Sequence, residues 1–259
     1  MDAARIARIA GQIAVFVAFF AIWELLVRLT GIKAVILPPP SLIFTTIVLR
    51  SHYLLQESIP TAIAIAGGFM FAVVSGFIIA VGIAYSRLVN EVVYPFLIVS
   101  QVLPKIALAP LFLIWFGFGL TPKLVIAALI AFFPIVVNTA RGLSSVEPEL
   151  IQYMRSLGAS WWDIFYKINL PWAMPYIFAS FKISITLAVV GVVVGEFVAS
   201  DTGLGYVIEY ANISLETPLM FAGIVVLSVL GILFFLIILA FEALFMSWQV
   251  DFAEIPETM

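Results

Sequence analysis

The feature that most constrains this chain is a series of long, nearly uninterrupted apolar stretches. An α-helix rises ~1.5 Å per residue, so about 20 apolar residues cross the ~30 Å hydrocarbon core of a bilayer. The stretches are continuous rather than alternating, which favours helices over a β-barrel. The stretches long enough to span lie at about 9–29, 60–85, 92–117, 122–143, 172–199 and 218–247. The pattern predicts an all-α, polytopic transmembrane helical bundle of six spans, with an N-terminal span at 9–29 and core spans within 60–247, in one domain over 1–259.

Composition agrees with a protein embedded in lipid and excludes several other classes. Hydrophobic side chains make up 64% of the chain and charged ones 10%, whereas an ordinary soluble domain carries roughly 25% charged residues. The net charge of -3 argues against a basic surface, so we expect no nucleic-acid partner. The chain has no cysteine, and His52 is its one histidine. Thiolate and imidazole metal sites and a histidine-based catalytic triad are therefore not expected.

The orientation in the membrane follows from the number of spans and from the positive charges in the connecting segments. An even number of spans places both termini on the same side. Lysine and arginine are enriched in short cytoplasmic loops. With the N-terminus inside, the cytoplasmic segments hold Arg5, Arg8, Arg87, Arg141, Arg155 and Lys167, and the external ones hold Arg28, Lys33, Arg50 and Lys123. This bias predicts that both termini are cytoplasmic.

The segment between the first two predicted spans has a different character. Pro38, Pro39 and Pro40 force an extended backbone, and Ser41 can then cap a helix. The following residues 42–55 mix Arg50 and His52 with apolar side chains. We expect an interfacial helix on the outer membrane surface, with an extramembrane linker as the alternative.

The longest polar stretch lies between the fourth and fifth predicted spans, at residues 141–171. Pro148 suits the first turn of one short helix, and Gly158 separates that helix from a second. The second helix carries four aromatic side chains: Trp161, Trp162, Phe165 and Tyr166. So many exposed aromatic residues in the middle of a loop predict a docking surface for another protein. The alternative is an aromatic belt at the lipid headgroups.

The end of this loop resembles a known motif. Gly158, nine further residues and then Ile168, Leu170 and Pro171 resemble the G-x9-I-x-L-P half of the conserved loop of ABC importer permeases. The family's usual Glu-Ala-Ala triplet is replaced by Tyr153, Met154 and Arg155. Other segments resemble the branch for nitrate, sulfonates, taurine, bicarbonate and thiamine-precursor pyrimidines: LPPPS at 37–41, PKIALAPL at 104–111, WFGFG at 115–119, FFPIVVNT at 132–139, GVVVGEF at 191–197 and GLGY at 203–206.

The resemblance implies a permease subunit in the bacterial plasma (inner) membrane, working with two cytosolic ABC ATPase subunits and an external or periplasmic solute-binding protein. One such loop per chain favours two copies of the permease, with a related second permease as the alternative. No P-loop of the form G-x-x-x-x-G-K-S/T occurs, so we expect no enzyme activity and no bound cofactor here, with ATP and Mg at the partner ATPase. The residues expected to couple to the ATPase are Tyr153, Arg155, Gly158, Trp161, Trp162, Phe165, Ile168, Leu170 and Pro171.

Ionisable and polar residues inside predicted spans are candidates for the translocation pathway, because charges are costly in the membrane. Lys105 lies between Pro104 and Pro110, which predict a broken helix of the kind that lines a cavity. An ion pair with a carboxylate is the alternative for Lys105 and Lys182. Glu196 is interpreted as a structural or gating group near the exit. The candidate pathway residues are Gln101, Lys105, Asn138, Lys182 and Glu196, although polar groups between helices also serve in packing.

Two further questions stay open at the level of sequence. The first is the transported solute, which the residues allow to be a small anion such as nitrate, bicarbonate or a sulfonate, or an aromatic or pyrimidine compound. The second is whether the chain works alone as a secondary transporter or channel. Such a protein would have no use for the G-x9-I-x-L-P loop, and its halves would be expected to show an inverted repeat, which is not evident.

Overall fold

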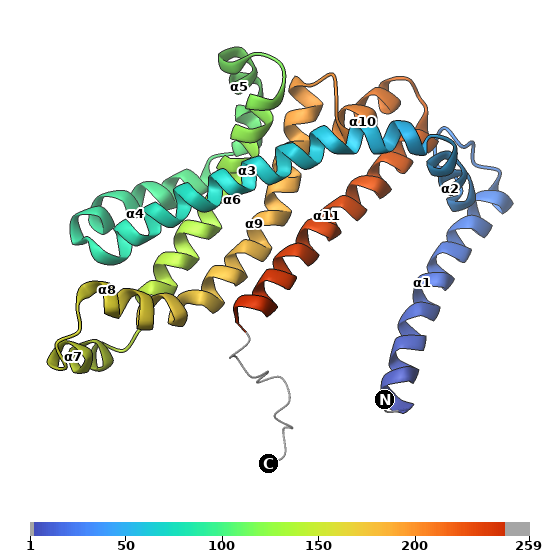
Figure 1. The fold of residues 1–259 in the computed structure, drawn as a ribbon. Helices are drawn as coiled ribbons and strands as arrows, with labels where there is room; N and C mark the ends of the chain where they lie inside the picture. The colour runs from blue at the N-terminus through green and yellow to red at the C-terminus, as the bar shows by residue number, and fades with distance from the viewer. Residues whose placement is uncertain (1–2, 247–259) are drawn as a thin grey trace. The chain divides into compact units, whose positions relative to one another are not determined.

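The computed structural model describes residues 3–246, and all regular structure in this range is helical (Figure 1). The α-helices are α1 (Ala3–Thr30), α2 (Pro40–Leu49), α3 (Ser51–Tyr85), α4 (Arg87–Val102), α5 (Ala109–Phe116), α6 (Leu120–Leu143), α7 (Pro148–Ser156), α8 (Trp161–Ile164), α9 (Leu170–Ala199), α10 (Leu204–Ile213) and α11 (Thr217–Phe245). A 3-10 turn, η1, covers Lys105–Leu108, and a π-helical turn, η2, covers Phe165–Asn169. The prediction of an all-α protein is confirmed.

Several of these helices can cross a membrane. Four are long and apolar enough, at Ser51–Tyr85, Leu120–Leu143, Trp161–Val198 and Thr217–Phe245. A fifth span results if Arg87–Val102 and Lys105–Phe116, which meet at an angle of 87°, are counted as one. The predicted span 9–29 lies in α1, which is not among these helices. A multi-span helical protein is therefore confirmed, whereas the count of six stays a prediction.

The described chain forms two compact units. One contains the described residues up to Thr61 together with Asp201–Ser228, and the other contains Ala62–Ser200 together with the described residues from Val229 onward. The prediction of a single domain over 1–259 is not tested by this grouping.

The first unit is organised by carboxylate and hydroxyl groups at helix starts. Glu24 of α1 accepts hydrogen bonds from the backbone N–H of Ser41 at 3.0 Å and from its hydroxyl at 2.8 Å, at the start of α2. Glu57 accepts from the backbone N–H of Gly203 at 2.6 Å, and Thr61 accepts from that of Leu204 at 2.8 Å. These groups satisfy the free N–H groups at the starts of α2 and α10, where a negative charge is also favoured.

The predicted interfacial helix over 42–55 is wrong in its extent. Helix α2 ends at Leu49, Arg50 leaves the helical backbone with φ -105° and ψ 16°, and α3 begins at Ser51. His52 therefore belongs to the long helix α3 instead of the short one. The helix that contains the second predicted span therefore begins at Ser51, before residue 60.

The second unit is built on the close packing of α6 against α9, with α3 on α6. Ala127 of α6 is the contact point, because a Cβ placed on Gly191 of α9 would lie 2.6 Å from the Ala127 Cα. A Cβ on Gly68 of α3 would lie 2.6 Å from the Ala127 Cβ. Small residues let helix backbones approach closely in lipid, where packing drives association. Gly68 and Gly191 therefore allow α3 and α9 to pack closely against α6.

The third predicted span is broken, as its two prolines predict. Helix α4 ends at Val102, Leu103 has an extended backbone with φ -65° and ψ 131°, and after Pro104 the segment formed by η1 and α5 runs at 87° to α4. Pro110 lies in the first turn of α5, where its missing N–H costs nothing.

Candidate functional site

A cavity of about 420 Å³ brings three of the five predicted pathway residues together within the second unit. Gln101 comes from α4, Lys105 from η1 and Asn138 from α6. The remaining wall is formed by Ile130, Phe133, Pro134, Val137, Ile183 and Leu187 of α6 and α9. Because the break at Pro104 turns the chain, Gln101 and Lys105 reach the same cavity from two different helical segments.

The polar groups of this cavity have defined neighbours. The Lys105 ammonium lies 4.4 Å from the centroid of the Phe133 ring, in a cation–π contact. The side-chain NH₂ of Asn138 donates to the backbone carbonyl of Pro134 at 2.9 Å. The side-chain oxygen of Asn138 takes no part in that bond. The lining thus combines one ammonium group and two carboxamides with apolar side chains.

Lys182 does not line this cavity. Its ammonium donates to both carboxylate oxygens of Glu242 on α11, at 2.8 and 2.9 Å, and both side chains are partly buried. The structure therefore shows the ion pair that was the alternative to a pathway role. Sequence reasoning missed Glu242 as the partner, because the pairing depends on how α9 and α11 are rotated.

Glu196 also lies away from the cavity lining and pairs with Lys123 of α6 at 3.6 Å. The side chain of Lys123 is 2% exposed and that of Glu196 is 0% exposed. The assignment of Lys123 to an external loop is therefore wrong, because α6 begins at Leu120 and places Lys123 in its first turn, facing α9. The signal that could have found it is Pro122, which suits an early helix position one residue before.

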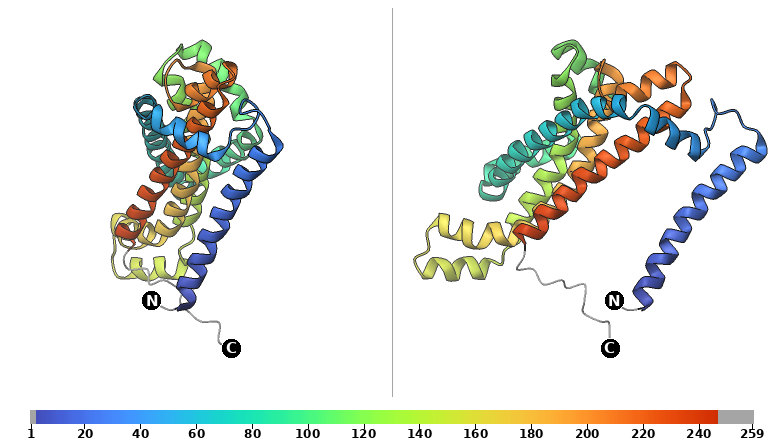
Figure 2. Two further views of the ribbon diagram at one scale, coloured as in Figure 1. Left: turned by 90° about the vertical axis from the view of Figure 1, so that its right-hand side faces the viewer. Right: turned by 45° about the vertical axis from the view of Figure 1, so that its right-hand side comes forward.

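The polar loop contains the two predicted helices, α7 and α8, which lie side by side at one end of α6 and α9 (Figure 2). Gly158 separates them with φ +79°, a left-handed backbone that favours glycine. Its N–H donates to the Arg155 carbonyl, and the Ala159 N–H donates to that of Met154 at 3.1 Å, which closes the end of α7. Ser160 and Asp163 then form a capping box at the start of α8.

The aromatic residues of this loop form a stacked cluster with one exposed side. Trp161 stacks on Phe165 with centroids 5.3 Å apart, and Trp162 stacks on Tyr166 at 5.8 Å. Trp162 and Tyr166 are exposed at 61% and 59%, whereas Phe165 is buried with Leu143. The expectation that Phe165 is exposed is wrong, because its ring packs in a cluster with Leu143, Ala173 and Ile177 of α6 and α9. Among the other predicted coupling residues, Tyr153, Arg155 and Gly158 are exposed, and Ile168, Leu170 and Pro171 are partly buried.

Asn169 is a polar residue of this loop that sequence reasoning did not select. It is 2% exposed, its amide donates to the Tyr85 hydroxyl of α3, and its carbonyl oxygen has no partner. It lines a hollow of about 140 Å³ together with Tyr85, Ile151, Arg155, Ala159, Trp161 and Ile164. Its position inside the I-x-L-P motif is the signal that could have identified it.

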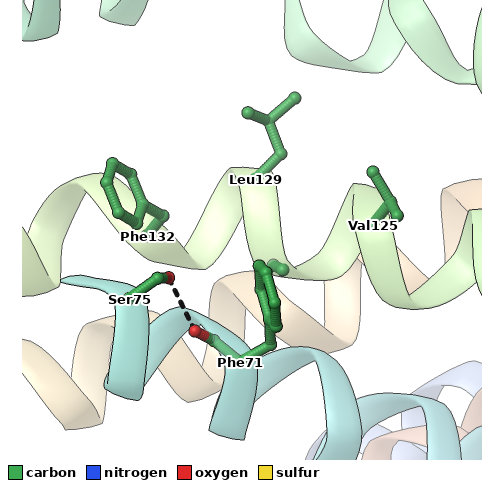
Figure 3. Close-up of a pocket in the computed structure, with 6 residues that line it drawn as sticks. Phe71, Ser75, Val125, Leu129 and Phe132 are labelled. Atoms are coloured by element: carbon green, nitrogen blue, oxygen red, sulfur yellow. Dashed lines mark hydrogen bonds between the residues drawn. The ribbon is translucent and has the colours of Figure 1, made fainter.

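A third hollow, of about 290 Å³, lies where α3 meets α6 and is apolar (Figure 3). Its lining residues are Phe71, Ser75, Val125, Ala128, Leu129 and Phe132. The Ser75 hydroxyl donates to the Phe71 carbonyl at 2.6 Å, so it is used within its own helix. This hollow suits hydrocarbon, and the cavity with Lys105 is the better candidate for a polar solute.

Comparison with known proteins gives a consistent picture. Residues 72–246 match the family described as binding-protein-dependent transport system inner membrane component. The chain is 34% identical to the formylaminopyrimidine transport permease protein ThiX of Halalkalibacterium halodurans, over 90% of this chain and 94% of that protein. It is 35% identical to the riboflavin transport system permease protein RibX of Chloroflexus aurantiacus, over 88% and 85%. It is also 32% identical to the putative aliphatic sulfonates transport permease protein SsuC of Bacillus subtilis, over 88% and 84%.

The fold also matches a solved transporter. A chain of the MetNI methionine ABC transporter in an inward-facing conformation aligns with a TM-score of 0.64 and 22% identity, over 74% of this chain and 96% of that chain. This likeness concerns the fold. The family match and the identity to the relatives show that this chain belongs to the binding-protein-dependent transport system inner membrane components, as a multi-pass permease subunit of an ABC importer.

Proposed function

We propose that this permease forms the solute pathway of an ATP-driven importer through the cavity lined by Gln101, Lys105 and Asn138. The observation that carries the proposal is the continuity of the chain from the aromatic cluster to that cavity. Trp161–Val198 is one long helical stretch, with α8, η2 and α9 following one another directly. Ile183 and Leu187 of α9 line the cavity. A displacement of α8 by a partner is therefore transmitted to the cavity wall without an intervening loop.

The same geometry and the family support a set of partners. We propose that the exposed surface of Trp161, Trp162 and Tyr166 docks on a cytosolic ABC ATPase, which supplies the ATP and Mg chemistry. One docking surface per chain favours two permease copies and two ATPases, with an external binding protein delivering the solute. Both termini and the docking surface would then face the cytoplasm of a bacterial cell. Closure of the ATPase pair would move α9 and the packed α6 together and alternate access to the cavity.

Co-purification with the cognate ATPase tests this function. We expect the permease to bring the ATPase through affinity and size-exclusion chromatography, and a double substitution, Trp161→Ala with Trp162→Ala, to abolish the association. Trp115→Ala is the matched control, because Trp115 is 62% exposed and lies outside the docking surface. An ATPase that never associates, or one that is retained equally by the double variant, would contradict the proposal.

Dependence on the binding protein separates an importer from a transporter that works alone. Cells lacking the cognate binding protein should lose uptake of its solute. Transport at the full rate without the binding protein or without the ATPase would instead support a stand-alone secondary transporter or channel.

A further inference from the structure

The charge of the cavity is unbalanced. Lys105 is the one charged residue among the described side chains that line it, and none of these carries a carboxylate. The two other lysines buried or half-buried between the helices of this unit have acidic partners, since Lys123 pairs with Glu196 and Lys182 with Glu242. Lys105 has an aromatic ring instead, that of Phe133.

An ammonium group in this position is costly to keep. Charged side chains within membrane-spanning segments face a large desolvation penalty, which acidic partners normally offset. The face of a phenylalanine ring offers only part of that compensation. An anion in the cavity would supply the rest, so the site is better satisfied when occupied by a negatively charged solute than when empty.

The other lining residues and the volume of the cavity restrict the solute further. Besides Lys105, the lining holds the two carboxamides of Gln101 and Asn138, and each carboxamide can both donate and accept hydrogen bonds. Ile130, Val137, Ile183 and Leu187 add an aliphatic wall to the same cavity. The volume of about 420 Å³ lies in the range of small-molecule sites, roughly 300–1,000 Å³. A fully hydrated inorganic ion would leave the aliphatic wall without a partner.

We propose that the transported solute is a small organic monoanion with a compact apolar body, and that Lys105 is the residue that determines this specificity. The anionic group pairs with Lys105 and accepts hydrogen bonds from the carboxamides of Gln101 and Asn138, and the apolar body lies against the aliphatic wall. This inference rests on the proposed function of the cavity as the solute pathway.

Direct binding of probe molecules that differ in charge tests the proposal. The purified permease–ATPase complex in phosphatidylcholine nanodiscs is titrated with benzoate, benzamide and benzylammonium, with empty nanodiscs as the partition control. We expect benzoate to bind at least about tenfold more tightly than neutral benzamide, the size of one charge-assisted hydrogen bond. Benzylammonium should bind more weakly than either.

Variants at position 105 test whether Lys105 causes the preference for benzoate over benzamide. Lys105→Gln should remove the difference between benzoate and benzamide, whereas Lys105→Arg keeps the charge and should retain it. Lys33→Gln is the matched control, because Lys33 is exposed and lies outside the cavity. A thermal transition unchanged by Lys105→Gln shows that the variant is folded.

The outcomes separate this inference from the proposed function. Equal binding of benzoate and benzamide by the parent complex, or a benzoate preference that persists in folded Lys105→Gln, overturns the monoanion assignment even when the ATPase co-purifies. Loss of ATPase association overturns the importer proposal. In that case, titration of the permease alone with the same three probes still measures whether the cavity prefers an anion.

Discussion

The buried pair of Lys123 and Glu196 allows a stringent test of what holds α6 and α9 together. The perturbation is Lys123→Met, which keeps an unbranched side chain and removes the positive charge. Glu196 then stays with a side chain that is 0% exposed and without its cationic partner.

The size of the effect follows from burial. Removing one partner of a buried ion pair costs about 3–5 kcal/mol, because the remaining charge is left uncompensated. Replacing both members by apolar residues is often close to neutral. We therefore expect Lys123→Met to be strongly destabilising and the double variant, Lys123→Met with Glu196→Leu, to recover most of the loss.

The assay is the thermal transition of the purified permease in one fixed detergent, followed by intrinsic fluorescence. The single variant should lower Tm by on the order of 10 °C, from the cost above and the usual dependence of Tm on stability. Arg87→Met is the control, since Arg87 and Glu91 form a shorter pair, 2.8 Å, with side chains that are 93% and 63% exposed. An exposed pair contributes little, so this variant should leave Tm unchanged.

Two results would refute this reasoning. A Lys123→Met variant as stable as Arg87→Met would show that the buried carboxylate finds another way to be satisfied. A double variant as unstable as the single one would show that lost packing, and not an uncompensated charge, causes the damage.

Three further predictions concern single positions. Gly191→Ala should lower the free energy of unfolding by roughly 1–3 kcal/mol, because the added Cβ would lie 2.6 Å from the Ala127 backbone. Gly231→Ala is the control, since its Cβ would have no contact closer than 3.8 Å, and thermal melts compare the two variants. Gly158→Ala should lower the free energy of unfolding by about 1–2 kcal/mol, because the backbone φ of +79° strains a residue that has a Cβ. Gly158→Asn should lower it less, since asparagine tolerates this conformation better, and the same melts measure both. Ser160→Ala removes the N-cap of α8 at a cost of about 1 kcal/mol and should weaken ATPase association more than Ser156→Ala does in a pull-down assay.

Local signals account for the parts of the structure that were predicted correctly. Pro104 with Pro110 predicted the broken span, and Gly158 predicted the boundary between two short helices in the polar loop. Each of these signals acts within a few residues through sterics and backbone hydrogen bonding. The end of α2 at Leu49 was missed, because no proline or glycine marks the interruption at Arg50.

The partners of the charged residues could not be predicted in the same way. Glu242 and Lys123 are distant in sequence from Lys182 and Glu196, and their pairing depends on the rotation and height of packed helices. The burial of Phe165 likewise depends on tertiary packing against Leu143 of α6 and Ala173 of α9.

The sequence by itself determined that this protein is a bundle of apolar helices with one polar aromatic interruption, since hydropathy and helix ends are local properties. Only the tertiary structure decided which of the candidate charges are neutralised and which remains. Packing through Ala127 and Gly191 brings α6 against α9, where Lys123 meets Glu196, and Lys182 of α9 meets Glu242 of α11. Lys105 is left beside Phe133 in the cavity, because a charge in lipid is balanced only by the groups that folding places next to it.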